Sequence, residues 1–500
     1  MSGPLRLVPD EGTPGWAEEA MRLRTVPRRR PGPADQPTPE ISPDPLDELA
    51  ERLAELCADA VHPYEIAAFL ESDGLTDEQA ALVYGRPDSF TLAEDLFDKV
   101  ARRYPGPVSA GADPWRADPW RCLVRGLVFA LPGLGYLLGA DFFNTHRTRF
   151  GMPSGMAALA AATLLSWAFN QALAYRAYGW LSLGERRSAA RALALGAPVG
   201  AVLAAGVGWV LGGPLAALLF TIGQSGYLGA ATALLVLGKE RLLLAALAPS
   251  AVGAGLVLEV QLPSWVKVVI LLATLAGTLG LAGWELRLCL AEPGGSGRGG
   301  PAWHVTGAAG LFGLAVGTLT MISGLGPTLH HAVRATGPAP APSATGPCLV
   351  ALTLSLGLAE WLLYRYRSLA TAALRTSASP AAFRRRTALV LAGCLLGYLL
   401  VVAGLALGAD ALWAHTPPIG TTQLTDLLLL AATLWTALLL QALSVTWRTA
   451  GLCLAAAGYE VLALLTGGDP QELQLYGCGA AAVLLIPLAV IVLGRTTRHR

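Results

Sequence analysis

The sequence predicts an all-α polytopic membrane protein: about twelve transmembrane helices in two six-helix bundles, preceded by a small, soluble, helical N-terminal domain. Over half of the 500 residues (53%) are hydrophobic and only 14% are charged, against about one quarter in soluble domains. The charge is also uneven, because 23 of the 35 acidic residues precede Arg121. From Cys122 onward, apolar stretches recur that are long enough to cross about 30 Å of hydrocarbon.

The first 43 residues are rich in proline and polar side chains. This composition predicts a disordered cytoplasmic tail, and it lacks the apolar segment of a signal peptide. A tandem repeat, Asp-Pro-Trp-Arg, occupies residues 113–121 immediately before the first apolar run. Tryptophan favours the membrane interface and arginine the cytoplasmic side. We therefore interpret 113–121 as an interfacial anchor.

Residues 44–112 are expected to form a small acidic cytoplasmic domain of four short helices, because leucines recur there on one helical stripe. Thr76 with Gln79, and Thr91 with Glu94, have the spacing of capping boxes. The cysteines are scattered along the chain without a CxxC pair, so neither a zinc site nor a disulfide framework is predicted. The domain has no evident catalytic arrangement.

The membrane body divides at a glycine-rich segment. We predict a first six-helix bundle over 122–290, a cytoplasmic linker over 291–302, a second bundle over 303–494 and a cytoplasmic tail over 495–500. Both halves begin from the same side, which favours parallel repeats. The expected spans are 122–143, 154–180, 192–212, 214–237, 241–260, 265–289, 303–327, 346–366, 387–408, 423–445, 449–467 and 473–494.

Basic residues alternate between the connections in the way that the positive-inside rule requires. If the N-terminus is inside, the external connections hold four, namely Arg147, Arg149, Lys267 and Arg334. The internal connections and the C-terminal tail hold seventeen: Arg186, Arg187, Arg191, Lys239, Arg241, Arg287, Arg298, Arg365, Arg367, Arg375, Arg384, Arg385, Arg386, Arg448, Arg495, Arg498 and Arg500. This sorting predicts an inner (plasma) membrane protein with both termini in the cytoplasm.

Polar residues inside the apolar runs are candidates for function, because a polar group in hydrocarbon requires a partner or water. Arg125 either extends to the cytoplasmic face or lines a path, and Pro132 and two glycines interrupt its helix. Asn170 and Gln171 in the second span, and Gln224 in the fourth, either bond neighbouring helices or line a polar substrate path.

Two intramembrane glutamates have different interpretations. Glu460 lies within the eleventh span without a charged neighbour in the sequence, so it is either a proton- or cation-coupling carboxylate or a satisfied structural one. Glu360, toward the inner end of the eighth span, is expected to pair with Arg365 or Arg367. No nucleotide-binding fingerprint occurs, so no cofactor is predicted, and no basic stripe with interleaved aromatic residues indicates nucleic acid.

The segment SWAFNQALAYRAYGWLSLGERRSAARALALG (166–196) resembles the second helix and following loop of flippases in the multidrug/oligosaccharidyl-lipid/polysaccharide superfamily. Their LGxGDRxxA-like pattern is matched by Leu183, Gly184, Arg186 and Ala189, with Glu185 in place of Asp. Residues 220–253 are similar to the fourth and fifth helices of Pel-type polysaccharide exporters.

This resemblance implies a transporter that moves an envelope polysaccharide or a lipid-linked saccharide by alternating access. Glu460 would couple an ion gradient, and Asn170, Gln171 and Gln224 would bond sugar hydroxyls. The partners would be the lipid bilayer and the saccharide. One alternative is a non-transporting scaffold whose N-terminal domain recruits a glycosyltransferase. Another is a polytopic glycosyltransferase that uses Asp141 in the first external loop.

Overall fold

The computed structural model describes residues 44–101, 118–143, 155–293, 300–334, 345–412 and 418–496, and over these it is helical without strands. Two compact units divide at Asp113, and each is described by itself. The predicted tail (1–43), the C-terminal residues from 497, residues 113–117 of the anchor and residues 294–299 of the linker lie outside the described residues.

Over residues 44–101, the N-terminal unit contains five helices, where four were expected. They are α2 (Pro45–Arg52), α3 (Ala54–Asp59), α4 (Pro63–Ser72), α5 (Asp77–Tyr84) and α6 (Ser89–Lys99). The expected first helix breaks at Leu53, which separates α2 from α3. The fully buried side chains of Ile66, Leu92 and Leu96 form the centre of a core that belongs to this unit alone.

Side-chain caps define two of these helices. The predicted capping box of Thr76 and Gln79 begins α5. The second predicted box is wrong, because Asp88 is the N-cap of α6 and its carboxylate accepts from the Thr91 N–H at 2.7 Å. That hydrogen bond holds the pKa of Asp88 below its usual range. Burial raises the pKa of the Cys57 thiol, which packs in the core.

In its described residues, the second unit contains twelve helical segments long and apolar enough to cross a membrane, in agreement with the twelve predicted spans. Its elements are α7 (Pro119–Ala130), α8 (Pro132–Gly139), η1 (Ala140–Phe142), α9 (Met156–Ser182), α10 (Arg186–Leu211), α11 (Leu215–Val236), α12 (Glu240–Glu259), α13 (Ser264–Ala291), α14 (Trp303–Arg334), α15 (Thr345–Leu354), α16 (Leu356–Thr376), α17 (Pro380–Leu412), α18 (Thr421–Ala442), α19 (Thr446–Leu465) and α20 (Pro470–Leu493).

Two of the spans are broken helices. The first span is interrupted between α7 and α8, where Pro132 cannot donate a backbone hydrogen bond to the preceding turn. The eighth span is interrupted at Ser355, between α15 and α16. The Ser355 hydroxyl bonds the Leu352 carbonyl at 2.7 Å and lies 3.0 Å from the Tyr398 hydroxyl, which satisfies the buried polar group.

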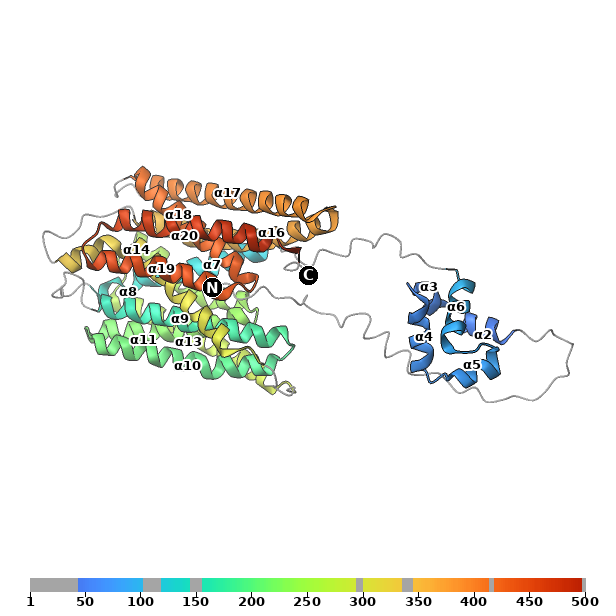
Figure 1. Ribbon diagram of the computed structural model, residues 1–500. Helices are drawn as coiled ribbons and strands as arrows, with labels where there is room; N and C mark the ends of the chain where they lie inside the picture. The colour runs from blue at the N-terminus through green and yellow to red at the C-terminus, as the bar shows by residue number, and fades with distance from the viewer. Residues whose placement is uncertain are drawn as a thin grey trace. The chain divides into compact units, whose positions relative to one another are not determined.

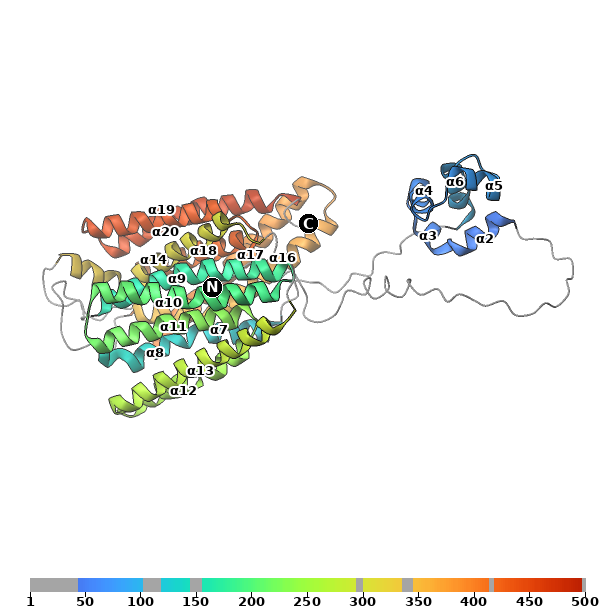
Figure 2. The ribbon, with the colours of Figure 1, turned by 90° about the horizontal axis from the view of Figure 1, so that it is seen from below.

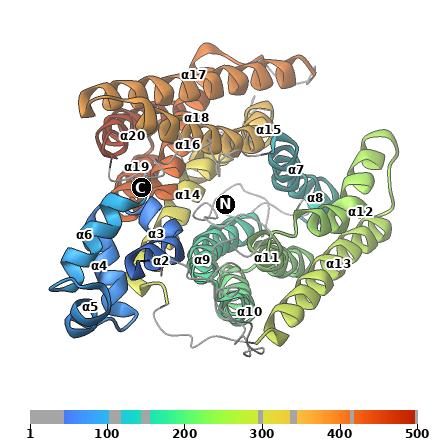
Figure 3. The same ribbon diagram turned by 90° about the vertical axis from the view of Figure 1, so that its right-hand side faces the viewer.

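The helices form two bundles with separate hydrophobic cores, and this confirms the predicted fold class. One core contains buried residues between Val128 and Cys289, and the other contains buried residues between Phe312 and Leu493. Figure 3, viewed along the helices, shows α10–α13 on one side and α15–α20 on the other. Figure 2 shows α12 and α13 together at one edge of the first bundle, and they are in contact.

Two helix pairs join the bundles. The first helix of the second half, α14, packs on α9, the second helix of the first half. Reciprocally, α7 packs on α15 and α16, the broken second span of the second half. Equivalent helices therefore make the two contacts, as parallel repeats related by a two-fold axis would.

Glycines bring the helices of both pairs close together. A Cβ atom added at Gly126 of α7 would lie 2.9 Å from the Gly357 Cα of α16, so the two backbones touch there. On α14, Gly313 leaves room for Gln171 of α9, whose Cβ would be 2.7 Å from an added Cβ. Small residues at such crossings are typical of helix pairs in membranes.

The helices lie along one common direction and reverse at each connection (Figure 1). We call the end where α7 begins and α20 ends the proximal end, and the opposite end the distal end. The arginine pattern predicts that the proximal end is cytoplasmic. Lys267, expected in an external connection, lies instead inside α13, three residues from its distal start.

Candidate functional site

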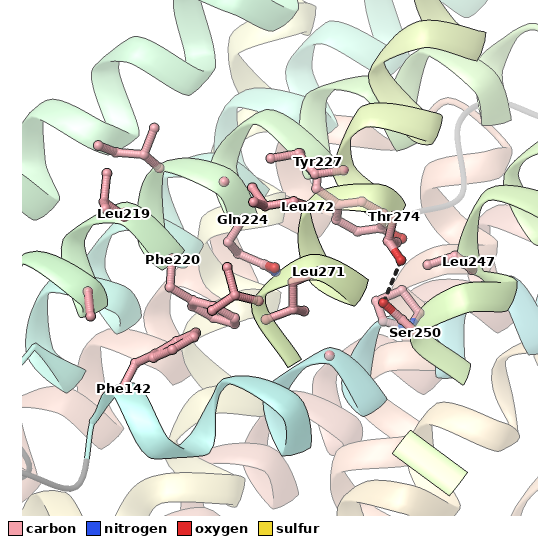
Figure 4. Close-up of a pocket in the computed structure, with 17 residues that line it drawn as sticks. Phe142, Leu219, Phe220, Gln224, Tyr227, Leu247, Ser250, Leu271, Leu272 and Thr274 are labelled. Atoms are coloured by element: carbon pink, nitrogen blue, oxygen red, sulfur yellow. Dashed lines mark hydrogen bonds between the residues drawn. The ribbon is translucent and has the colours of Figure 1, made fainter. Parts of the chain in front are cut away.

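A pocket of about 430 Å³ lies within the first bundle, between α8, α11, α12 and α13 (Figure 4). Its volume is within the range of small-molecule sites, roughly 300–1,000 Å³. Phe142, Ala216 and Val268 line it near the distal helix ends, and Pro132 and Leu247 line it near mid-helix. The pocket thus extends from the distal end toward the middle of the body.

The pocket is mostly apolar, with four polar side chains in its lining. Gln224, a residue singled out from the sequence, is one of them, and its Nε2 donates to the Tyr136 hydroxyl at 3.0 Å. Deeper in the pocket, the hydroxyls of Ser250 and Thr274 bond each other at 2.8 Å, as Figure 4 shows. Because each of these hydroxyls has the other as a partner, they leave only one O–H hydrogen without an acceptor, and this part of the pocket presents little unmet polarity to a ligand.

Arg125 lies at the centre of an ionic cluster near the proximal end. It is six residues into α7, about 9 Å from the helix start, and its side chain is only 15% exposed. Its guanidinium pairs with Glu360 of α16, and its Nε lies 3.2 Å from a Glu240 carboxylate oxygen at the start of α12. Its Nη2 lies 3.4 Å from the Tyr178 hydroxyl of α9.

The expected pairing of Glu360 with Arg365 or Arg367 is therefore corrected: its partner is Arg125. Gly357, one turn before Glu360, is where α7 crosses α16, so the crossing brings a residue 235 positions away within reach. The ion pair joins the first bundle to the second.

A second group of contacts joins the bundles at the proximal end. The Arg176 guanidinium of α9 donates to the Pro301 carbonyl at 3.0 Å and stacks 3.6 Å from the centre of the Trp303 ring. Pro301 and Trp303 are the residues that lead into and begin α14. A cation over a tryptophan face is attracted by the ring quadrupole, so this contact adds to the link that Arg125 makes between the bundles.

Asn170 and Gln171 lie on the buried part of α9, with 4% and 7% exposure. Gln171 packs against Gly313 of α14, at the contact between the bundles. The Asn170 Oδ1 and the Ser166 hydroxyl, one turn apart, are buried without a hydrogen-bond partner among the described residues. Neither Asn170 nor Gln171 lines the pocket of Figure 4.

Glu460 is fully buried in the second bundle, on α19, five residues before the distal end of that helix. The Cys478 thiol of α20 donates to its Oε1 at 3.4 Å, and the other oxygen, Oε2, has no partner in the part of the chain that the structure describes. Gly477 makes room for the carboxylate, because a Cβ there would lie 2.6 Å from Oε1.

Sequence reasoning missed two further polar groups near Glu460. Asp426 is the sixth residue of α18 and Gln474 the fifth of α20, and both helices start at the distal end. Gln474 is one turn, about 6 Å, on the distal side of Cys478. Asp426 Oδ1 and Gln474 Nε2 are buried without partners among the described residues. The signal was present, since Asp426 is an acidic residue inside the tenth apolar run.

The five predicted residues therefore occupy separate places rather than one site. Gln224 lines the pocket, Arg125 joins the bundles at the proximal end, Asn170 and Gln171 lie on α9, and Glu460 is buried in the second bundle. Within the described ranges, no group of three or more His, Cys, Asp and Glu residues has the arrangement of a metal site.

Asp141, the carboxylate of the glycosyltransferase alternative, forms an ion pair. Its Oδ2 lies 2.6 Å from the Lys267 Nζ of α13. Asp141 belongs to η1 and is half-exposed, with 47% of its side chain accessible. The pair connects two elements that border the pocket.

Comparison with known proteins gives little beyond this geometry. No protein-family model matches the sequence, and no curated protein matches it. Among solved structures, the crystal structure of a point mutant of MATE is similar with a TM-score of 0.43 and 12% sequence identity, over 78% of this chain and 98% of that chain. The chain is a multi-pass membrane protein by its twelve apolar helices, and its own geometry is the basis for any assignment of function.

Proposed function

We propose that the protein is a membrane transporter that moves an amphiphilic, lipid-linked saccharide of the cell envelope by alternating access. The observation that carries this proposal is the way the two bundles meet. Each has its own core, and they are joined by two glycine-lined helix crossings. Ionic contacts of Arg125 and Arg176 bridge them at the proximal end. Two rigid bodies with such contacts can rock without unpacking either core.

The pocket supports a lipid-linked substrate over a free polysaccharide. Thirteen of its seventeen lining residues are apolar, and a sugar chain would require many more hydrogen-bonding groups. An acyl or polyprenyl chain fits such a lining.

Glu460 is our candidate for ion coupling. A carboxylate that is fully buried and has one oxygen without a partner is costly when charged. Protonation, or binding of a cation, removes that cost. Asp426 and Gln474 lie between Glu460 and the distal helix ends, so they would serve as the route by which the proton or cation arrives.

Transport in proteoliposomes tests this proposal. A fluorescent polyprenyl-phosphate-linked disaccharide would be added, and its movement between leaflets followed by quenching. The wild type should move the probe faster than protein-free vesicles and accumulate it when an ion gradient is imposed. Glu460→Gln should lose the gradient-driven accumulation and retain passive exchange. Glu472→Gln, an exposed carboxylate at the start of α20, is the matched control. A wild-type rate equal to that of empty vesicles would overturn the proposal.

A scaffold is the second candidate, and one observation favours it. The acidic N-terminal domain exposes large apolar side chains, with Val61 and Leu82 more than 80% accessible and Tyr64 at 60%. Residues 44–101 enclose their own core, so the fragment is expected to fold alone. Stoichiometric capture of a glycosyltransferase by this fragment, together with no transport by the membrane body, would favour the scaffold.

A further inference from the structure

A lysine lies beside the distal edge of the first-bundle pocket, on the face of α13 whose next turns line the cavity. Lys267 precedes Leu271 by four residues and Thr274 by seven, which are the intervals of one helical face, and both line the pocket. Its neighbour Val268 also lines the pocket. The Lys267 side chain is only 13% exposed. A cation is therefore held at the distal edge of an apolar cavity.

Asp141 neutralises this cation, and the pair is asymmetric. The carboxylate is 47% exposed while the lysine is 13% exposed. Removing a partner from a mostly buried charge is costly, but replacing one anion by another leaves the charge paired. If an anion takes the place of Asp141 on the lysine, the half-exposed Asp141 carboxylate can be hydrated without moving. The geometry therefore allows an incoming anion to replace Asp141 on Lys267 at low cost.

We propose that this pocket binds an anionic amphiphile: the apolar chain occupies the cavity, and the phosphate group of the head takes the place of Asp141 on Lys267. This inference rests on the proposed transport function, because it names the chemical class of the substrate in the same pocket. The floor suits a hydrocarbon chain, since Ser250 and Thr274 bond each other. The head group remains at the distal edge, where Asp141 and the end of α8 meet the start of α13.

Ligand binding to the full-length protein tests this assignment. Native mass spectrometry of the detergent-purified chain would compare 1-oleoyl lysophosphatidic acid with monoolein, which has the same acyl chain on an uncharged glycerol. We expect the phosphate-bearing lipid to bind about tenfold more tightly, the ratio that one charge-assisted hydrogen bond supplies. Lys267→Met should abolish this preference and leave monoolein binding unchanged. Lys239→Met, which affects a lysine paired with Glu285 near the proximal end, should change neither.

Asp141→Asn gives an independent result, because it removes the competing carboxylate and should strengthen lysophosphatidic acid binding several-fold. This variant keeps the assignment testable if Lys267→Met fails to fold. The assignment would be overturned if folded Lys267→Met still preferred lysophosphatidic acid to monoolein, or if the wild type bound both lipids equally. In either case the pocket and the transport proposal would stand. Competition by inorganic phosphate as effective as that of the lipid would show that the site binds an anion only, and would also overturn it. No binding of either lipid would remove the pocket from both proposals.

Discussion

Replacement of Gly357 by alanine should weaken the contact between the two bundles. An added Cβ at this position would lie 2.6 Å from the Cys122 carbonyl oxygen and 3.1 Å from the Gly126 Cα. Both atoms belong to the backbone of α7, which cannot move aside as a flexible side chain can. Ordinary contact begins near 3.4 Å, so α7 and α16 would separate locally by roughly 0.8 Å, the difference between the two distances.

The expected cost follows from overpacking. Forcing a methyl group into a closely packed contact typically costs about 1–3 kcal/mol. The separation also acts on the ion pair of Arg125 with Glu360, which is one turn from Gly357. We therefore expect Gly357→Ala to reduce the free energy of unfolding by about 1–3 kcal/mol, and to increase water access at the proximal end.

Two measurements check this prediction. Denaturant titration of the purified protein in detergent gives the change in stability, and hydrogen exchange of α7 and α16 reports access. Gly397→Ala in α17 is the matched control, because nothing lies within 4 Å of a Cβ at that position. Alanine there should be neutral or slightly stabilising, since it favours helix. If the two variants had equal stability and equal exchange, the backbone contact that we describe would be refuted.

Three further predictions concern single residues. Arg125→Met should destabilise the protein by about 3 kcal/mol or more, because it leaves the mostly buried Glu360 carboxylate unpaired and leaves Glu240 with Arg121 alone, at 3.6 Å; a loss below about 1 kcal/mol in a denaturant titration would contradict this. Gly477→Ala should abolish gradient-driven transport, because its Cβ would displace the Glu460 carboxylate, whereas Gly479→Ala, whose nearest neighbour is 3.7 Å away, should not. Asp88 has a lowered pKa in the folded N-terminal domain. Its contribution to stability is therefore complete when the pH is above the ordinary pKa of 3.8, and it is lost as the pH falls through the lowered pKa of the folded state. Asp88→Asn should flatten this acid dependence of stability in a pH titration of fragment 44–101.

The sequence predicted those features that depend on neighbouring residues. Twelve spans were predictable because a helix that crosses hydrocarbon must be apolar over its own length. The break at Pro132 was predictable because proline lacks the backbone donor that the helix requires. The capping box of Thr76 with Gln79 involves only four consecutive positions. In each case, the interaction is contained within one segment of the chain.

The features that sequence reasoning missed depend on how distant segments pack. Arg125 and Glu360 are 235 positions apart, and their pairing follows from a helix crossing that no local pattern encodes. The nearer arginines were assigned to Glu360 because only proximity in sequence was available. Similarly, Lys267 was counted among loop charges, and its place at the edge of a pocket follows from the packing of α13 beside α8. The sequence shows that Asp426 lies inside the tenth span. Its position along the membrane-crossing direction relative to Glu460 follows only from the packing of α18 beside α20.

The position of Glu460 also limits how coupling could operate. This carboxylate is buried against α20, a helix that belongs to neither of the pairs that join the bundles. Its helix α19 packs extensively on α14, and α14 is the helix that contacts α9 of the first bundle. If a change in the charge of Glu460 shifts α19, this displacement has to be transmitted through one helix, α14, to reach the contact between the bundles. Gly313 of α14, which accommodates Gln171 of α9, lies on that route. If coupling follows this path, a bulkier residue at Gly313 should disturb the contact with Gln171 and disconnect ion binding from the motion of the bundles. Passive exchange of the substrate should then continue, but the imposed ion gradient should no longer drive its transport.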